Sequence, residues 1–220
     1  MTQRIVVINP NSNQTVTGTI DRACDRLRLA GGPDIECVTL PEGPRGIETQ
    51  EHVESVVLPL QRTIRARDND ADAFVIACFS DPGIHLARET TRKPVFGIAE
   101  SAYLTALTRG ERFGVISILA TSIPRHLRQI RQLGLLDRFA GDRAIGLGVG
   151  AVAEGADTGE RMVHVGQQLR DLDGASVLVM GCAGMARFRA AVEAAVGVPV
   201  VEPTQAAVTM ALGAVRIAGA

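Results

Sequence analysis

The sequence predicts an α/β protein made of two pseudo-symmetric lobes, each with a parallel sheet flanked by helices, and with the active site in the cleft between the lobes. Two observations support this fold class. Short runs rich in β-branched residues alternate with amphipathic helical stretches along the chain, which is typical of βαβ units. In addition, the pattern of the first half of the chain recurs in the second half, as expected when one arrangement is used twice.

Strands and helices are expected to alternate through the first half of the chain. Each expected strand is an apolar run bounded by turn residues, and each expected helix carries apolar residues at helical spacing. In order these elements are the strand RIVVIN, a helix over 14–29, the strand IECVTL, a helix over 51–67, the strand AFVIAC, a helix over 84–91 and the strand PVFGI. Such alternation predicts parallel strands with helices covering the sheet.

The internal repeat centres on two cysteines. The segment ADAFVIACFSDPG reappears as GASVLVMGCAGM, and each copy is followed by a Pro-Val strand and a helix. Cys182 follows Cys78 by 104 positions, and Pro199 follows Pro94 by 105. The nearly constant offset predicts two similar lobes, each with a cysteine at the end of a strand.

Helix signals follow both cysteines. After Cys78, Asp81 is expected to cap the next helix, with Pro82 in its first position. After Cys182, the segment MARFRAAVEAAVG predicts a helix with an apolar stripe that ends at a glycine cap, Gly197. Both thiols are therefore expected next to helix N-termini.

Composition and charge exclude several classes of function. The formal net charge is −1, with six Phe, one Tyr and no Trp, which leaves neither a basic surface nor enough aromatic rings to bind nucleic acid. No apolar run approaches the roughly 20 residues of a membrane span, and the N-terminus is predicted to be a strand and not a signal peptide. We expect a cytoplasmic protein with a small-molecule substrate and no nucleic-acid or membrane partner. We also expect a homo-oligomer.

No cofactor and no metal are expected. The four cysteines are unclustered, and the four histidines lack the spacing of metal ligands. The glycines of GLGVGAVAEG, residues 146–155, are not in the first strand-to-helix turn, so a loop or a glycine-containing strand is expected there and not a dinucleotide site. The single lysine, Lys93, lies in a loop at the wrong end of a strand for a Schiff base with pyridoxal phosphate. Cys24 and Cys37 are expected to be structural.

The two strand-end thiols suggest proton transfer. In open parallel sheets the ligand site lies beyond the carboxyl ends of the strands, so Cys78 and Cys182 should face each other across the inter-lobe cleft. A helix N-terminus favours a thiolate, and two thiols in one dry cleft should share a proton and titrate as a coupled pair. One thiol could then remove a proton from one face of a carbon while the other delivers a proton to the opposite face. The predicted outcome is racemisation without a cofactor.

The negative charge that develops during such a reaction requires hydrogen-bond donors. Candidate donors are the backbone N–H groups that follow each cysteine and the short polar side chains of two turns at equivalent strand ends. The expected substrate-binding residues are Asn11, Ser12, Phe79, Ser80, Thr121, Ser122, Ala183 and Gly184. The expected catalytic residues are Cys78 and Cys182.

Several motifs resemble those of the aspartate/glutamate/hydantoin racemase superfamily, specifically its hydantoin and allantoin racemase branch. They are INPNS near the N-terminus, GPRGIE at 43–48, ACFSDPG around Cys78, GVISILATS at 114–122 and GCAGM around Cys182. The resemblance implies two pseudo-symmetric α/β lobes and two cysteines that act as opposed acid and base without cofactor or metal. Those roles transfer to Cys78 and Cys182, and the implied substrate is a 5-substituted hydantoin or allantoin.

The resemblance also implies a domain organisation. The first lobe would span residues 1–102 and be joined by a C-terminal helix over 205–220, while the second lobe would span 103–204. Together the two lobes would form one catalytic unit.

Departures from related families leave alternatives open. Glutamate-type members carry Cys-Asn-Thr and Gly-Cys-Thr-His segments, whereas this chain has CFSDPG and GCAGM, so an acidic amino acid is a less favoured substrate than a cyclic ureide. Arylmalonate decarboxylases keep one of the two cysteines and maleate isomerases keep both. The alternatives are an aspartate/glutamate-type racemase, a maleate-type cis/trans isomerase, and a non-catalytic two-lobed small-molecule-binding protein.

Overall fold

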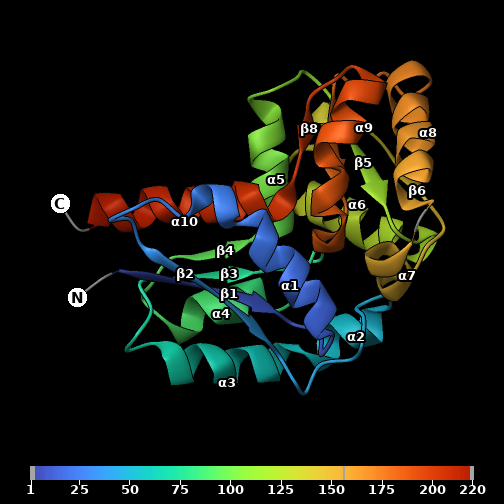
Figure 1. The fold of residues 1–220 in the computed structure, drawn as a ribbon. Coiled ribbons are helices and arrows are strands. Elements are labelled where there is room, and N and C mark those ends of the chain that lie inside the picture. The colour runs from blue at the N-terminus through green and yellow to red at the C-terminus, as the bar shows by residue number, and fades with distance from the viewer. Residues whose placement is uncertain (1–2, 156, 219–220) are drawn as a thin grey trace.

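Two four-stranded parallel sheets form the centres of two lobes (Figure 1). The computed structural model describes residues 3–155 and 157–218. The first sheet has the strand order β2-β1-β3-β4 and the second has the order β6-β5-β7-β8. The equivalent order in the two sheets, with every neighbouring pair parallel, confirms the predicted fold class.

The first sheet is buried on both faces. Its strands are β1 (Arg4–Asn9), β2 (Asp34–Thr39), β3 (Ala73–Ile76) and β4 (Val95–Gly97). Because side chains alternate along a strand, Ile5 and Val7 pack toward α1 (Gln14–Ala23), while Val6 and Ile8 pack toward α3 (Val57–Arg67) and α4 (Ile84–Thr90). The remaining helical elements of this half are η1 (Asp25–Leu27), α2 (Gln50–Ser55) and α5 (Ile98–Leu107).

The second lobe repeats this plan. Its strands are β5 (Phe113–Ser117), β6 (Phe139–Ala144), β7 (Val177–Met180) and β8 (Val200–Val201). Its helical elements are η2 (Ala120–Ser122), α6 (Ile123–Gln132), η3 (Leu136–Arg138), α7 (Val149–Glu154), α8 (Thr158–Asp171), η4 (Ala183–Phe188) and α9 (Arg189–Val196). Helices α8 and α9 lie side by side over one face of the sheet (Figure 1). Helix α5 contacts strands β5, β7 and β8, and α6 contacts β6.

The last helix, α10 (Pro203–Ala218), follows β8 of the second lobe but packs on the first lobe. It contacts strands β1, β3 and β4 and helix α5 (Figure 1). The chain therefore crosses between the lobes twice, once through α5 and once at the start of α10. An expected lobe boundary between residues 102 and 103 falls within α5.

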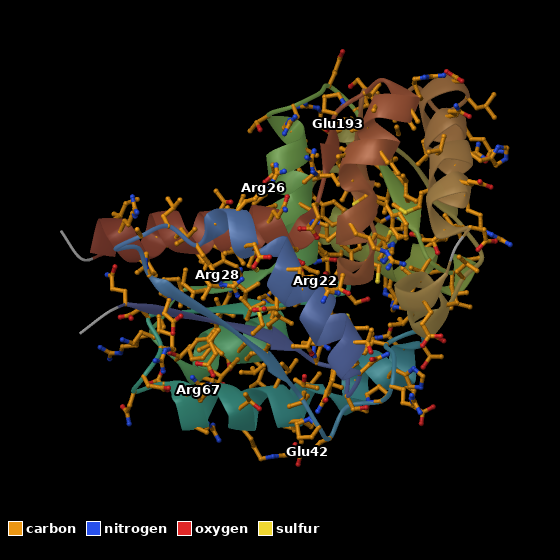
Figure 2. All side chains as sticks on the ribbon, viewed as in Figure 1. Arg22, Arg26, Arg28, Glu42, Arg67 and Glu193 are labelled. Carbon is orange, nitrogen blue, oxygen red and sulfur yellow. The ribbon has the colours of Figure 1, made fainter. Side chains whose placement is uncertain are left out.

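Aromatic side chains connect the lobes through α5. The ring of Tyr103 is fully buried and lies 5.4 Å from the ring of Phe79 in the first lobe and 5.3 Å from that of Phe113 in the second. The apolar cluster that contains Tyr103 includes residues of both sheets. Charged side chains such as Arg26 and Glu42 lie on the outside (Figure 2). Continuous apolar packing at the crossover makes the two lobes one packed body there.

Three local predictions were wrong. The helix expected over 51–67 is two helices that meet at Val56. The segment expected to be a loop or strand within 146–155 contains a short helix, α7, because the N–H group of Val149 donates to the Glu48 carboxylate of the other lobe and so gains a cap. Asp81 does not cap α4, which begins at Ile84 after a glycine in the left-handed conformation.

Within the described part of the chain, none of the helices combines the length and the apolar character needed to cross a membrane.

Candidate active site

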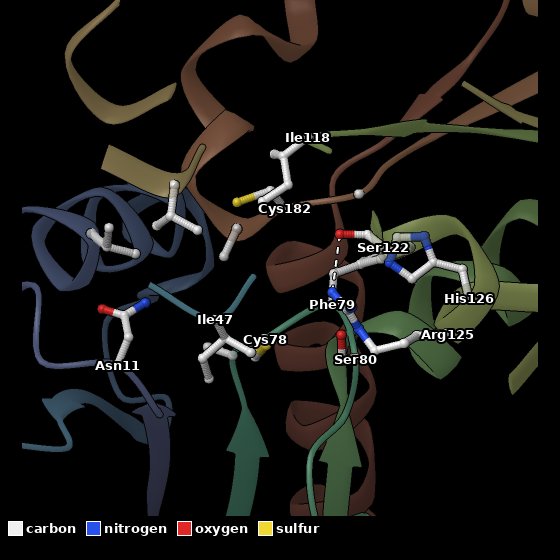
Figure 3. A pocket seen from close by; sticks show the side chains of 15 residues that line it. Asn11, Ile47, Cys78, Phe79, Ser80, Ile118, Ser122, Arg125, His126 and Cys182 are labelled. Carbon is white, nitrogen blue, oxygen red and sulfur yellow. Dashed lines mark hydrogen bonds between the residues drawn. The ribbon is translucent and has the colours of Figure 1, made fainter. Parts of the chain in front are cut away.

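The two cysteines singled out by the repeat reach one pocket from the two lobes. Cys78 follows strand β3 of the first sheet, and Cys182 follows strand β7 of the second. Both strands occupy the third position of their sheets, so the two thiols stand at equivalent strand ends. Both are half-buried, and Figure 3 shows them on different sides of the same pocket.

The pocket between the thiols is small and mostly apolar. Its free space is about 30 Å³, which is room for only one or two water molecules. Its walls come from the strand ends of both lobes, from α1, from the starts of α6 and α7, and from the segment that holds Ile47. The lining residues are Asn11, Val16, Ile47, Ala77, Cys78, Phe79, Ser80, Ile118, Ser122, Arg125, His126, Val149, Gly181, Cys182 and Ala183.

Burial raises the pKa of both thiols. The pKa of Cys78 is raised to about 12, mainly by desolvation, and the nearby Cys182 raises it further. The pKa of Cys182 is raised to about 11 by desolvation, with smaller upward contributions from the carboxylates of Glu202 and Glu48. Both sulfurs are therefore protonated near neutral pH in the described conformation.

The predicted lowering of the thiol pKa by helix N-termini was wrong. Helix α4 begins six residues after Cys78, so no helix N-terminus lies directly at that sulfur. Cys182 does precede η4, and the N–H group of Gly184 donates to its Sγ over 3.4 Å. The backbone N–H groups of Ser80 and Gly184 do lower the pKa of the neighbouring thiols, but removal of the thiols from water has the larger effect.

Buried carboxylates cap the two helices that cross between the lobes. Asp81, in the loop after Cys78, accepts hydrogen bonds from the N–H groups of Ala99 (2.9 Å) and Glu100 (2.8 Å) at the start of α5. Glu202 accepts hydrogen bonds from the N–H groups of Thr204 (3.1 Å) and Gln205 (2.6 Å) at the start of α10.

Asp81 and Glu202 are almost completely buried, and desolvation raises the pKa of each to about 7. The capping role predicted for Asp81 thus applies to α5 and not to α4. The caps fix the crossover helices beside the pocket.

A segment of the first lobe closes one side of the pocket. Ile47 lines the pocket, and its neighbour Glu48 is held by the second lobe at two points. The Glu48 side chain accepts a hydrogen bond from the N–H group of Val149 over 2.8 Å, and its backbone carbonyl accepts one from Nη2 of Arg125 over 3.3 Å. The segment around residues 46–48 therefore bridges the lobes and limits access to the thiols.

Most predicted substrate-binding residues lie at the pocket. Asn11, Phe79, Ser80, Ser122 and Ala183 line it. The Asn11 side chain is fixed because its Oδ1 accepts hydrogen bonds from Asn9 Nδ2 (3.0 Å) and from the N–H group of Asn13 (2.9 Å). Its Nδ2 points toward the pocket (Figure 3), which makes it an oriented donor.

Three predicted residues are absent from the lining. Ser12 uses its N–H group to donate to the Pro44 carbonyl, over 2.9 Å. The exposed Thr121 donates its hydroxyl to the backbone carbonyl of Glu48, over 3.3 Å. The Gly184 N–H group contacts the Cys182 sulfur.

Sequence reasoning missed a polar cluster beside the pocket. His126 lines the pocket from α6, and its ring is hydrogen-bonded to Ser117, at the end of β5, and to Asp142, within β6. Arg125 also lines the pocket, and its Nη2 donates to Ser122 Oγ over 3.1 Å (Figure 3). A serine at the end of the strand GVIS was visible in the sequence, but its partners are distant in the chain and gave no motif. Among the described residues, no group of three or more His, Cys, Asp or Glu side chains is placed to hold a metal ion.

Solved structures of racemases share this architecture. Allantoin racemase from Klebsiella pneumoniae superposes with a TM-score of 0.91 and 32% sequence identity, covering 99% of this chain and 89% of that chain. Allantoin racemase from Pseudomonas fluorescens superposes with a TM-score of 0.93 and 28% identity, covering 98% of this chain and 92% of that chain. The fold, the strand-end pocket and these similarities place the protein in the class of racemase-type isomerases.

Sequence comparison also shows the family to which the chain belongs. The chain belongs to the Asp/Glu/Hydantoin racemase family, whose profile matches residues 5–211. A hydantoin racemase of Paenarthrobacter aurescens is 35% identical over 212 residues, which cover 94% of this chain and 89% of that protein. The predicted resemblance is therefore confirmed.

Proposed function

We propose that this protein is a cofactor-independent racemase of a cyclic ureide, either a 5-substituted hydantoin or allantoin, and that Cys78 and Cys182 transfer the protons. The observation that carries the proposal is the pair of thiols at equivalent strand ends of the two lobes, both lining one pocket. The similarity to hydantoin racemase and allantoin racemase proteins supports the substrate class.

The proposed reaction is a two-step proton transfer at the C5 stereocentre. One cysteine, as a thiolate, removes the C5 proton, and the electron pair of the C–H bond moves into the adjacent carbonyl to form an enolate. The other cysteine, as a thiol, then donates its proton to C5 from the opposite face as the carbonyl re-forms. The first sulfur ends protonated and the second ends as a thiolate, so the same pair can run the reverse reaction.

Polar groups of the pocket could stabilise the enolate. Asn11 Nδ2 and the Ser122 hydroxyl are candidate donors to the carbonyl oxygen that gains charge. Arg125 also lines the pocket, and its positive charge lowers the pKa of Cys78 although burial has the larger effect. The thiolate that starts the reaction is therefore a minor species even with Arg125 beside it, and we propose that substrate binding favours it further.

Substrate entry requires the pocket to widen. The free space of about 30 Å³ is too small for a five-membered ring. The Glu48 contacts with Val149 and Arg125 hold the first lobe against the second at the pocket. We propose that these contacts break to admit substrate and re-form over it, which would exclude water from the reacting carbon.

The test uses single enantiomers of several 5-substituted hydantoins and of allantoin in heavy water. Loss of optical rotation with incorporation of deuterium at C5 is expected for at least one ureide. Cys78→Ser and Cys182→Ser should each reduce racemisation by about 10²- to 10⁴-fold, while Cys37→Ser, a half-buried cysteine that does not line the pocket, should retain activity.

Three results would contradict the proposal. Exchange with aspartate, glutamate or maleate and with no ureide would favour an amino-acid racemase or a cis/trans isomerase. Ureide binding without exchange would favour a binding protein. Racemisation at the normal rate by either Cys78→Ser or Cys182→Ser would show that the substituted thiol is not required.

A further inference from the structure

We propose that His126 accepts a hydrogen bond from a ring N–H group of the substrate through Nε2, and that Asp142 and Ser117 fix the ring for this purpose. This inference rests on the proposed function, because it assigns a specificity-determining residue to the same pocket. No step of the proposed proton transfer uses His126, Asp142 or Ser117.

The polar cluster of His126, Asp142 and Ser117 is almost completely buried, which is unusual for such side chains. His126 is 2% exposed, the Asp142 side chain is 1% exposed, and Ser117 is fully buried. His126 Nδ1 lies 2.8 Å from Asp142 Oδ2 and 3.1 Å from Ser117 Oγ. A buried histidine and carboxylate are retained only where hydrogen bonds compensate for the loss of hydration. An apolar side chain at position 126 would avoid that loss, so the imidazole is expected to have a role in the pocket.

The hydrogen-bond pattern fixes the tautomer of the ring. The Ser117 hydroxyl donates its single hydrogen to Asp142 Oδ1, so Ser117 Oγ can act only as an acceptor toward His126. An ionised Asp142 is also only an acceptor. His126 Nδ1 must therefore carry the hydrogen, and in the neutral ring Nε2 is left with a free lone pair.

That lone pair is available to the pocket. His126 is a lining residue, and its ring points toward Ser122 and the pocket (Figure 3). The ring of Phe79 packs edge-on against the imidazole, with the centroids 5.0 Å apart and the planes at 89°. Asp142 and Ser117 on one side and Phe79 on another hold the ring in a single orientation.

A cyclic ureide provides the complementary donors. Hydantoin and allantoin rings carry planar N–H groups, each of which loses a hydrogen bond to water on entering the pocket unless an acceptor replaces it. Asn11 Oδ1 is already occupied by Asn9 and Asn13, and Asn11 Nδ2 and Arg125 are donors only. The hydroxyls of Ser80 and Ser122 also line the pocket, but a hydroxyl oxygen is a weaker acceptor than a neutral imidazole nitrogen. His126 Nε2 is therefore the strongest side-chain acceptor that the lining offers, and a ring N–H is the group that it fits.

The test compares kcat/KM for a parent hydantoin with two analogues that carry the same 5-substituent. In the oxazolidine-2,4-dione analogue a ring oxygen replaces the N1–H group, and in the other analogue N3 is methylated. The wild-type enzyme is expected to prefer the parent over at least one analogue by about 10- to 100-fold.

Two variants of similar size separate hydrogen bonding from steric effects. His126→Gln keeps an acceptor near the position of Nε2 and should retain much of this preference. His126→Leu lacks an acceptor, and its parent-to-analogue ratio should fall to within about 3-fold of unity. His164→Gln, at an exposed histidine of α8, is the matched control and should keep the wild-type ratio.

A third variant acts on the ring without changing the pocket wall. Asp142→Asn can donate from its amide to Nδ1, which would move the ring hydrogen to Nε2 and turn the acceptor into a donor. The preference for the N–H substrate should then be lost, even if His126→Leu does not fold. Thermal unfolding of each variant shows whether the structure is retained.

The outcomes distinguish this inference from the proposed function. If the wild type racemises the parent hydantoin and both analogues equally well, the role of His126 is wrong and the proposed function stands. The same conclusion follows if His126→Leu and Asp142→Asn keep the wild-type ratio. If the wild type racemises no ureide at all, the proposed function and this inference are both overturned.

Discussion

Burial of the Asp81 carboxylate should make the free energy of unfolding depend on pH. Asp81 is 4% exposed, and desolvation raises its pKa from 3.8 to about 7 in the folded protein. The unfolded chain releases this proton near pH 4, so between about pH 4 and pH 7 the folded state binds more protons than the unfolded state. The contribution of Asp81 to stability is therefore expected to fall as the pH rises through this range.

The size of this loss of stability follows from the size of the pKa shift of Asp81. Each pKa unit corresponds to about 1.4 kcal/mol, so a shift of about three units corresponds to about 4 kcal/mol. Other groups also titrate, and comparison with Asp81→Asn isolates the effect because the amide does not titrate. The free energy of unfolding of the wild type, minus that of Asp81→Asn, is expected to fall by about 3 kcal/mol between about pH 4.5 and pH 8.

The measurement is urea unfolding at a series of pH values, followed by far-ultraviolet circular dichroism because the chain has no Trp and one Tyr. Asp173→Asn is the control. Arg143 donates two hydrogen bonds to Asp173, of 2.6 and 2.9 Å, and lowers its pKa, so Asp173 stays ionised in both the folded and the unfolded state. The free energy of unfolding of the wild type, minus that of Asp173→Asn, should therefore not change over this pH range.

If the free-energy difference between the wild type and Asp81→Asn does not change with pH, the reasoning is refuted, because burial would then not raise the pKa of the capping carboxylate. A difference that rises with pH would also refute it. In that case the hydrogen bonds from the N–H groups of Ala99 and Glu100 would outweigh desolvation.

Three further predictions concern the thiols, a glycine and a tyrosine. Because the pKa values of Cys78 and Cys182 are raised to about 12 and 11, kcat/KM for racemisation should rise about tenfold per pH unit from about pH 7 to 9; a plateau below about pH 8 would contradict the proposed thiolate base. Gly97→Ala should destabilise the fold by about 2 to 4 kcal/mol in thermal or urea unfolding, because the added Cβ would lie 2.2 Å from Cγ of Asp81, whose carboxylate caps α5. Gly150→Ala is the control and should leave stability unchanged, because the added Cβ would have no neighbouring atom within 4 Å. Tyr103→Phe should be neutral or stabilising by up to about 1 kcal/mol, because the buried hydroxyl has no partner among the described residues, and a clear loss of stability would reveal a partner.

Local sequence patterns predicted the first half of the chain well. The strands RIVVIN, IECVTL and AFVIAC correspond to β1, β2 and β3, because buried parallel strands are continuous β-branched runs that few other elements resemble. Helix limits were predicted less well. The helix expected over 14–29 ends at Ala23 and continues as η1, and the helix over 51–67 is divided at Val56. Helix ends depend on which groups outside the helix satisfy the terminal N–H and C=O groups.

Long-range contacts account for the larger errors. The start of α7 is capped by Glu48, which is 101 residues away, and no local pattern records such a partner. Asp81 caps α5 for the same reason, although its sequence position suggested α4. The thiol pKa values depend on how completely the closed pocket excludes water, and that property belongs to the packed lobes and not to the residues beside each cysteine.

Local sequence patterns were enough to predict that the protein is built twice on one α/β plan and that each half ends a buried strand with a cysteine, because strand patterns and repeats are local. Only the tertiary structure determined what surrounds those cysteines. His126 is joined to Ser117 and Asp142, and Glu48 closes the pocket from the other lobe. Hydrogen bonds of this kind join residues far apart in the chain, and the distance between such residues is set by packing alone.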